Sequence, residues 1–231
     1  MHARVARVLA RVRHVDVGYL PDMTDTDTDT ARLCAFALTC SLKPSPEPSS
    51  TDLLTQQLLD AMGEHGVEGE LVRAVDHDLR PGVESDMGEG DEWPALRERI
   101  LAADIFVLGT PTWMGQHSSV AQRVLERLDA ELSDTNDAGQ PRTYGRVAAA
   151  VVTGNEDGAH AISATLFQAL NDVGFTIPAG GVTYWNGEAM HTTDYKDLDE
   201  TPEKTASTTA TLAANAAHLA RLLRRSAYPP A

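Results

Sequence analysis

The sequence predicts a doubly wound α/β fold, in which a parallel sheet of five strands is covered by helices on both faces. Short, continuous apolar segments alternate along the chain with segments whose apolar residues have helical spacing. Continuously apolar strands between amphipathic helices are typical of parallel sheets that are buried on both faces. The length of 231 residues fits one such domain.

The first strand is expected at residues 33–38, where the chain reads Leu-Cys-Ala-Phe-Ala-Leu. A loop rich in Ser and Pro follows it. A helix comes next, because apolar side chains recur at helical spacing in Leu53, Leu54, Leu58, Leu59 and Met62. The second strand is expected near residues 69–75.

Two further units repeat the order of strand, loop and helix. Strand 105–108 is followed by loop 110–117, and strand 147–152 by loop 153–158. A strand near residues 175–182 and a closing helix complete the fold. The apolar faces of the three helices are formed by Val120, Val124, Leu125 and Leu128; by Ile162, Leu166, Phe167, Leu170 and Val173; and by Leu212, Ala216, Leu219 and Leu223.

The two ends of the chain are expected to lie outside this domain, which we place at residues 31–226. Residues 1–30 end in a Thr-Asp repeat that cannot bury enough apolar surface to order itself. Two explanations remain open for this stretch: a disordered tail, or a natural start of translation at Met23. Residues 227–231 form a short C-terminal tail.

Composition excludes several classes of protein. Thirty-four acidic residues against 19 basic ones give a net charge of -15, which argues against a nucleic-acid binder. Apolar runs stay far below the roughly 20 residues of a membrane helix, so no membrane insertion is expected. A strand separates Cys34 from Cys40 beyond disulfide reach, so both should be thiols. The thiols and the lack of an apolar export signal fit a cytoplasmic protein.

In doubly wound sheets, ligands bind outside the carboxyl ends of the strands, which makes loops 39–51, 110–117 and 153–160 the candidate site. The first loop contains no glycine, so it is neither a P-loop nor a dinucleotide-binding turn. Its hydroxyl groups and Lys43 precede a helix, where free backbone N–H groups favour an anion such as a phosphate monoester. The alternative is that Ser50 or Thr51 is only an N-cap.

The other two loops carry groups suited to a planar ring system. The second contains Trp113 and Met114, whose flat or polarisable side chains pack well on rings, although the tryptophan could equally form a subunit contact. The third contains small residues that allow close approach of the backbone. It also contains amide and acidic groups that can hydrogen-bond a polar ring edge.

Together these segments resemble the flavodoxin-like NAD(P)H-dependent FMN reductase family. Residues 109–129, GTPTWMGQHSSVAQRVLERLD, are similar to that family's second flavin loop and following helix. The first loop resembles its FMN phosphate loop, and residues 151–175 resemble the region after the fourth strand. The likeness covers residues 32–224. It implies a flavodoxin-like fold with strand order 2-1-3-4-5 and FMN as the cofactor.

The resemblance also assigns the cofactor-binding residues, without catalytic residues or metal ligands. The phosphate would be held by Ser41, Lys43, Ser45, Ser49, Ser50 and Thr51. The isoalloxazine would be lined by Pro111, Thr112, Trp113, Met114, Gly115, Thr153, Gly154, Asn155, Asp157 and Gly158. Residues 76–82 contain no cysteine, so no iron-sulfur cluster is expected.

Three functions remain open at this point. The resemblance implies an oxidoreductase that takes electrons from NAD(P)H and passes them through FMN to a quinone or similar small acceptor. The acidic balance instead favours a flavodoxin-type electron carrier, and a flavin-free binding module is the third possibility. The polar segment 76–92 and the aromatic-rich segment 183–203 favour the enzyme, because both can shape a pocket. The second segment is interpreted as a lid or a subunit contact within a homodimer or homotetramer.

Overall fold

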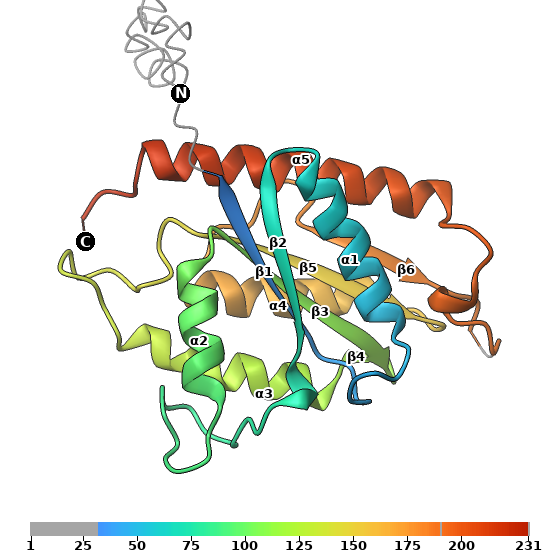
Figure 1. Ribbon diagram of the computed structural model, residues 1–231, viewed down its shortest axis with the longest axis horizontal. Coiled ribbons are helices and arrows are strands. Elements are labelled where there is room, and N and C mark those ends of the chain that lie inside the picture. Colours follow the sequence, from blue (N-terminus) through green and yellow to red (C-terminus); the bar gives the residue numbers. More distant parts are fainter. Residues whose placement is uncertain (1–31, 190, 231) are drawn as a thin grey trace, which may run out of the picture. The chain divides into compact units, whose positions relative to one another are not determined.

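The computed structural model describes residues 32–189 and 191–230, so the predicted N-terminal tail lies outside the described residues. Five parallel strands form the sheet in the order β2-β1-β3-β5-β6, which is the predicted order 2-1-3-4-5 (Figure 1). The flavodoxin-like α/β fold is thereby confirmed. The strands are β1 (Leu33–Thr39), β2 (Val67–Arg73), β3 (Ile105–Trp113), β5 (Val147–Gly154) and β6 (Val182–Asn186).

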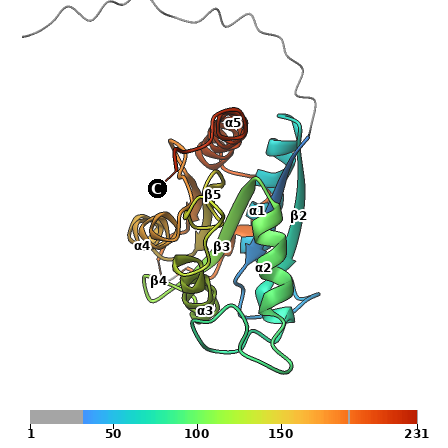
Figure 2. The same cartoon turned by 90° about the vertical axis from the view of Figure 1, so that its left-hand side faces the viewer.

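Helices cover both faces of the sheet and divide its core into two clusters (Figure 2). In β1, Phe36 and Leu38 face one cluster while Ala35 and Ala37 face the other, because successive side chains of a strand point to opposite faces. One face is covered by α2 (Trp93–Ala102), α3 (Ser119–Leu128) and α4 (Ala159–Asp172). The other is covered by α1 (Ser50–Gly63) and α5 (Glu203–Arg225).

The last strand is not where the sequence predicted it. Within the expected range 175–182, Thr176 makes only an isolated bridge to Val147, and the strand begins at Val182. Pro178 has no N–H group for a ladder, and Gly180 has a positive φ of 66°, so the chain turns here before it pairs with β5. The second strand lies slightly earlier than expected and ends at Arg73.

Two elements were not anticipated. Helix α2 buries Trp93, Leu96 and Ile100 at helical spacing, but arginines between them weaken the pattern. The two-residue strand β4 (Gln116–His117) folds back antiparallel on the end of β3.

Both cysteines are free thiols, as predicted, and burial raises the pKa of Cys40. Among the described residues no helix is long and apolar enough to cross a membrane.

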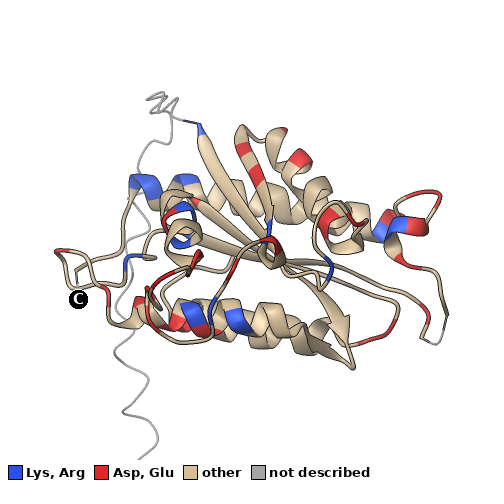
Figure 3. Cartoon of the chain, turned by 60° about the horizontal axis from the view of Figure 1, so that its bottom comes forward, with Lys and Arg blue, Asp and Glu red and all other residues tan. Residues whose placement is uncertain are grey.

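The residues that follow α5 pack against the domain. Tyr228 packs edge-on against Tyr144 with 5.7 Å between ring centroids, and its hydroxyl lies 2.9 Å from Thr176 Oγ1. Gln140 Nε2 donates to the carbonyl of Pro229 at 2.5 Å. Acidic side chains are spread over the loops and helices of the domain (Figure 3).

A buried ion pair holds the polar segment 76–92 against the domain. Arg127 NH2 donates to Asp91 Oδ2 at 2.7 Å, and both side chains are inaccessible to solvent. The same guanidinium donates to the carbonyl groups of Arg80 at 2.9 Å and Glu84 at 3.1 Å, and it lies 5.6 Å from the centre of the Trp93 ring. Four residues, Arg80, Glu84, Asp91 and Trp93, therefore contact one side chain.

Asp91→Ala should lower the free energy of unfolding by about 3–5 kcal/mol, because it leaves the Arg127 guanidinium buried without its counter-ion. Urea unfolding followed by far-UV circular dichroism measures the loss. Glu70→Ala is the control, since it breaks the solvent-exposed pair with Arg99 and should cost less than about 1 kcal/mol. Equal losses in the two variants would contradict the assignment of Arg127 as an anchor.

Candidate functional site

A cavity of about 420 Å³ opens at the carboxyl ends of the strands, where the three predicted loops meet. This volume lies within the range of roughly 300–1,000 Å³ that is usual for small-molecule sites. Strands β1 and β3 are neighbours from which the sheet continues in opposite directions, so the cavity lies at the switch point of the strand order. The location of the site is the predicted one.

The first loop leads into α1 with its backbone oriented by serine hydroxyl groups. Ser49 is the N-cap and accepts a hydrogen bond from Asp52 N at 3.2 Å. Ser41 Oγ accepts from Lys43 N at 3.2 Å and closes a tight turn. Lys43 itself is exposed at the cavity, and its ammonium group makes no ion pair with a described residue. An anion placed here would meet the helix N-terminus and a free cation.

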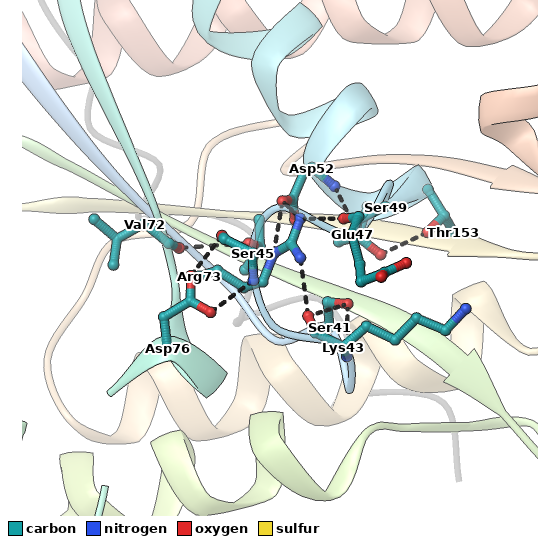
Figure 4. A network of polar contacts seen from close by, with 12 residues as sticks. Ser41, Lys43, Ser45, Glu47, Ser49, Asp52, Val72, Arg73, Asp76 and Thr153 are labelled. Carbon is teal, nitrogen blue, oxygen red and sulfur yellow. Dashed lines mark hydrogen bonds and ion pairs between the residues drawn. The ribbon is translucent and has the colours of Figure 1, made fainter. Parts of the chain in front are cut away.

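Arg73, which sequence reasoning missed, holds this loop in place from the end of β2 (Figure 4). Its side chain is almost fully buried, with 7% of the residue exposed. The guanidinium donates to the carbonyl of Lys43 at 2.9 Å, to that of Glu47 at 2.9 Å and to Asp52 Oδ2 through Nε at 2.9 Å. Two backbone carbonyl groups of the loop are thus bonded by one side chain from a neighbouring strand.

The hydroxyl groups around the cavity have different uses. Thr51 Oγ1 and Thr153 Oγ1 lie 2.7 Å apart and join α1 to the third loop. Ser45 faces away from the cavity, since its N–H and its hydroxyl donate to Asp76 at 2.8 and 2.5 Å. Ser49 and Ser50 only accept hydrogen bonds from described residues, so their hydroxyl protons remain available for a ligand.

The second loop is the tip of a hairpin. Met114 and Gly115 have φ of 53° and 73°, which reverses the chain between β3 and β4. Trp113 lines the cavity and is 54% exposed, whereas Met114 is 91% exposed and lies outside the cavity with Gly115. Thr112 also lines the cavity, and its buried hydroxyl has no partner among the described residues.

The third loop packs closely against the second. A Cβ atom on Gly154 would lie 2.6 Å from Thr112 Cβ, and one on Gly158 would lie 2.9 Å from the carbonyl oxygen of Gly115. Glycine is therefore required at both positions for the loops to meet. Thr153, Gly154 and Asn155 line the cavity, but Asp157 and Gly158 do not. Glu156 lines it too, and its carboxylate accepts from Met114 N at 2.7 Å.

A fourth wall comes from the chain after β6. Trp185 lines the cavity together with Asp194, Tyr195 and Lys196 of residues 191–202, a segment that we call the strap. The rings of Trp185 and Tyr195 have centroids 5.6 Å apart. Asn155 Nδ2 donates to Asp194 Oδ1 at 3.3 Å, which links the strap to the third loop. The high aromatic content of residues 183–203 was the sequence signal for this wall.

The other expected contribution to the pocket is absent. No residue of segment 76–92 lines the cavity, and the interpretation of this segment as a wall of the pocket was wrong. Arg80, Glu84 and Asp91 of this segment instead bond Arg127 of α3. Leu42 and Pro48 in the first loop were also missed as lining residues.

The predicted site residues therefore fall into two sets. Those that line the cavity are Ser41, Lys43, Ser49, Ser50, Thr51, Pro111, Thr112, Trp113, Thr153, Gly154 and Asn155. Those that lie beside it without lining it are Ser45, Met114, Gly115, Asp157 and Gly158. No group of three or more His, Cys, Asp and Glu side chains among the described residues is placed to hold a metal ion.

Comparison with known proteins agrees with this geometry. The family model for NADPH-dependent FMN reductase matches residues 35–189, from β1 past the third loop to the chain after β6. The chain belongs to this family. The resemblance predicted from the sequence is thereby confirmed, and family membership supports an FMN-binding flavoprotein.

Individual relatives extend the comparison. The chain is 44% identical over 169 residues to the divalent metal cation transporter MntH of Mycobacterium bovis, covering 71% of this chain and 25% of that protein. It is 34% identical over 166 residues to the 8-demethyl-8-aminoriboflavin-5'-phosphate synthase of Streptomyces davaonensis, covering 68% of this chain and 65% of that protein. The chain thus spans less than two thirds of either relative.

A solved structure is also similar to this chain in its backbone. The structure of RosB with the bound intermediate 8-demethyl-8-formylriboflavin-5'-phosphate superposes on this chain with a TM-score of 0.77 at 32% sequence identity. The superposition covers 85% of this chain and 82% of that one. An archaeal flavodoxin, with a TM-score of 0.53 and 10% identity, shares the fold alone.

Arg73→Met should speed amide hydrogen exchange in residues 42–49, because the carbonyl groups of Lys43 and Glu47 lose their donor. Asp52 loses its counter-ion in the same variant. Hydrogen exchange followed by mass spectrometry measures the effect peptide by peptide. Arg99→Met, which removes a half-buried arginine that pairs with Glu70 of β2, is the control and should leave this loop unchanged. Unchanged exchange in Arg73→Met would show that the loop is held by other contacts.

Proposed function

We propose that the cavity binds FMN, with the phosphate at the N-terminus of α1 and the ring between the second and third loops. The observation that carries this proposal is the arrangement of Ser49, Ser50 and Lys43. Two hydroxyl groups that donate to no described residue, and an ammonium group that forms no ion pair with one, surround a helix N-terminus that opens into the cavity. Donors of this kind at such a position suit a phosphate dianion.

The remaining lining residues also fit a flavin. Trp113 and Trp185 offer aromatic faces on which a ring system can pack. Pro111, Thr153, Gly154 and Asn155 complete the walls around that position. Met114, Gly115, Asp157 and Gly158 shape the loops behind them, and Ser45 orients the first loop through Asp76.

We further propose an oxidoreductase that takes electrons from NAD(P)H and passes them to a quinone or similar small acceptor. Bound FMN supplies the capacity to accept and return a hydride. The residues of this chain bind it, orient it, and form the aromatic and polar walls between which a donor and an acceptor could stack in turn. Orientation is what the protein must contribute to hydride transfer, so no general base is required.

A second candidate is modification of the flavin itself. It is favoured by the likeness to the 8-demethyl-8-aminoriboflavin-5'-phosphate synthase and by the RosB structure, in which the bound intermediate is an altered riboflavin-5'-phosphate. In that case FMN would be the substrate. Binding would use the same residues, while the ring would leave the site chemically changed.

We infer a homodimer or homotetramer in the cytoplasm. The exposed side chains of Trp113 and Met114 at the tip of the β3–β4 hairpin suit a contact between subunits at the mouth of the cavity.

The redox proposal predicts that the FMN-loaded protein, mixed with NADH or NADPH without oxygen, loses its flavin absorption within seconds and regains it on addition of a quinone. Stopped-flow spectroscopy measures both phases, with free FMN at the same concentration as the control. The flavin released afterwards should have the mass of FMN. A flavin that resists both nicotinamides but accepts single electrons from a partner reductase would indicate a carrier. A changed flavin mass would indicate the modifying enzyme.

The phosphate assignment predicts that Lys43→Ala weakens FMN binding about tenfold, since charge-assisted hydrogen bonds contribute roughly 1.5–3 kcal/mol and Lys43 is partly solvated. Riboflavin, which lacks the phosphate, should bind the variant and the unchanged protein equally well. Titrations that follow flavin fluorescence give both affinities. Equal losses for the two ligands would show that the loop does not hold the phosphate.

A further inference from the structure

The strap is fastened to the same end of α1 that faces the cavity. The backbone N–H of Lys196 donates to Ser50 Oγ at 3.2 Å. Tyr195, which is 2% exposed, donates from its hydroxyl to Gln57 Oε1 at 2.6 Å, and Gln57 Nε2 donates to Thr201 Oγ1 at 2.9 Å. The main chain of Lys196 therefore lies one hydrogen bond away from the first residue of the helix.

Lys196 carries a charge that the cavity can use. It is one of the residues that line the cavity, and its side chain is 27% exposed. Its ammonium group lies 2.7 Å from Asp197 Oδ2 and 3.3 Å from Asp194 Oδ2. The hydrogen bond to Asp197, followed by that to Asp194, raises the pKa of Lys196, so the side chain is a cation at neutral pH.

We propose that Lys196 is a second phosphate-binding cation, supplied by the strap, whose backbone meets α1 at Ser50. This inference rests on the proposed binding of FMN and names a residue that determines its selectivity for the phosphorylated flavin. Lys196 has a flexible four-carbon stem, and its backbone is anchored next to Ser50, so its ammonium group can turn from the aspartates to a phosphate at the N-terminus of α1.

The hydroxyl group of Ser50 also supports this role of the strap. Because its oxygen accepts the N–H of Lys196, its hydroxyl proton points to another partner, and none of the described residues accepts it. The strap thus supports phosphate binding in two ways. It supplies the ammonium group of Lys196, and it orients the hydroxyl group of Ser50 on α1. A phosphate dianion would then meet Lys43 from the first loop and Lys196 from the strap.

The two aspartates oppose this interaction. Asp194 and Asp197 are 45% and 50% exposed and keep the ammonium group at the edge of the cavity while no anion is bound there. A bound phosphate must compete with them for Lys196. Removal of one competitor should therefore strengthen binding of the phosphorylated ligand, and only when Lys196 is present.

The test compares FMN with riboflavin on the full chain, using flavin fluorescence titrations. Lys196→Met should weaken FMN binding about tenfold and riboflavin binding less than about twofold. Lys204→Met is the matched control, because Lys204 is another of the chain's three lysines, does not line this cavity and has no ion pair with a described residue. It should change neither affinity. Lys196→Arg, which keeps the charge, should retain most of the FMN affinity.

A double-mutant cycle sharpens the result. Asp197→Asn should tighten FMN binding about two- to fivefold in the unchanged protein and have no effect in the Lys196→Met background. Equal weakening of FMN and riboflavin by Lys196→Met, or an equal loss in Lys196→Arg, would overturn the inference and leave the strap as a packing element. An effect of Lys43→Ala without any effect of Lys196→Met would overturn it while preserving the proposed function. A protein that binds no FMN at all would overturn both.

Discussion

The site depends on one buried guanidinium. The loop between β1 and α1 has no glycine, and its own hydrogen bonds are those of two turns, at Ser41–Lys43 and Pro44–Glu47. It must nevertheless present a defined set of donors at the helix N-terminus. Arg73 supplies that definition by bonding two loop carbonyl groups and the carboxylate of Asp52 at once. Because the guanidinium is planar and has donors in fixed directions, these three partners fix the position of the loop relative to β2. The proposed phosphate position therefore depends on a neighbouring strand as much as on the loop.

The rest of the cavity follows from close contacts between loops that are distant in the sequence. The hydrogen bond between Thr51 and Thr153 joins α1 to the third loop, and the glycine at 154 lets that loop touch Thr112. The strap then meets α1 through Lys196 and the third loop through Asp194. The loops and the strap that line the cavity thus hold one another in position. The cavity depends on contacts across the whole domain and not on any single motif.

The sequence predicted what is encoded locally. The continuous apolar run of β1, the helical spacing in α1 and the hydroxyl-rich first loop can each be recognised within about a dozen residues, and all lie where expected. The sequence did not predict those elements whose position is decided by contacts between residues far apart in the chain. Pro178 and Gly180 prevent pairing before Val182, so the last strand begins later than predicted. The arginines of α2 interrupt its apolar pattern. Segment 76–92 bonds Arg127 and does not line the cavity. Arg73 carries no local signal, because its role exists only once β2 lies beside β1.

The distribution of charge bears on what the cavity exchanges with its surroundings. A carrier that docks basic partners would benefit from the net charge of -15, and nothing in the fold opposes such docking. Yet Trp185 and the strap cover one side of the cavity, and Asp194 and Glu156 add carboxylates to its lining. A cavity with four walls is larger than electron transfer across an exposed ring edge requires. We therefore infer that the strap suits the proposed enzyme, whose substrates must enter the cavity, better than a carrier.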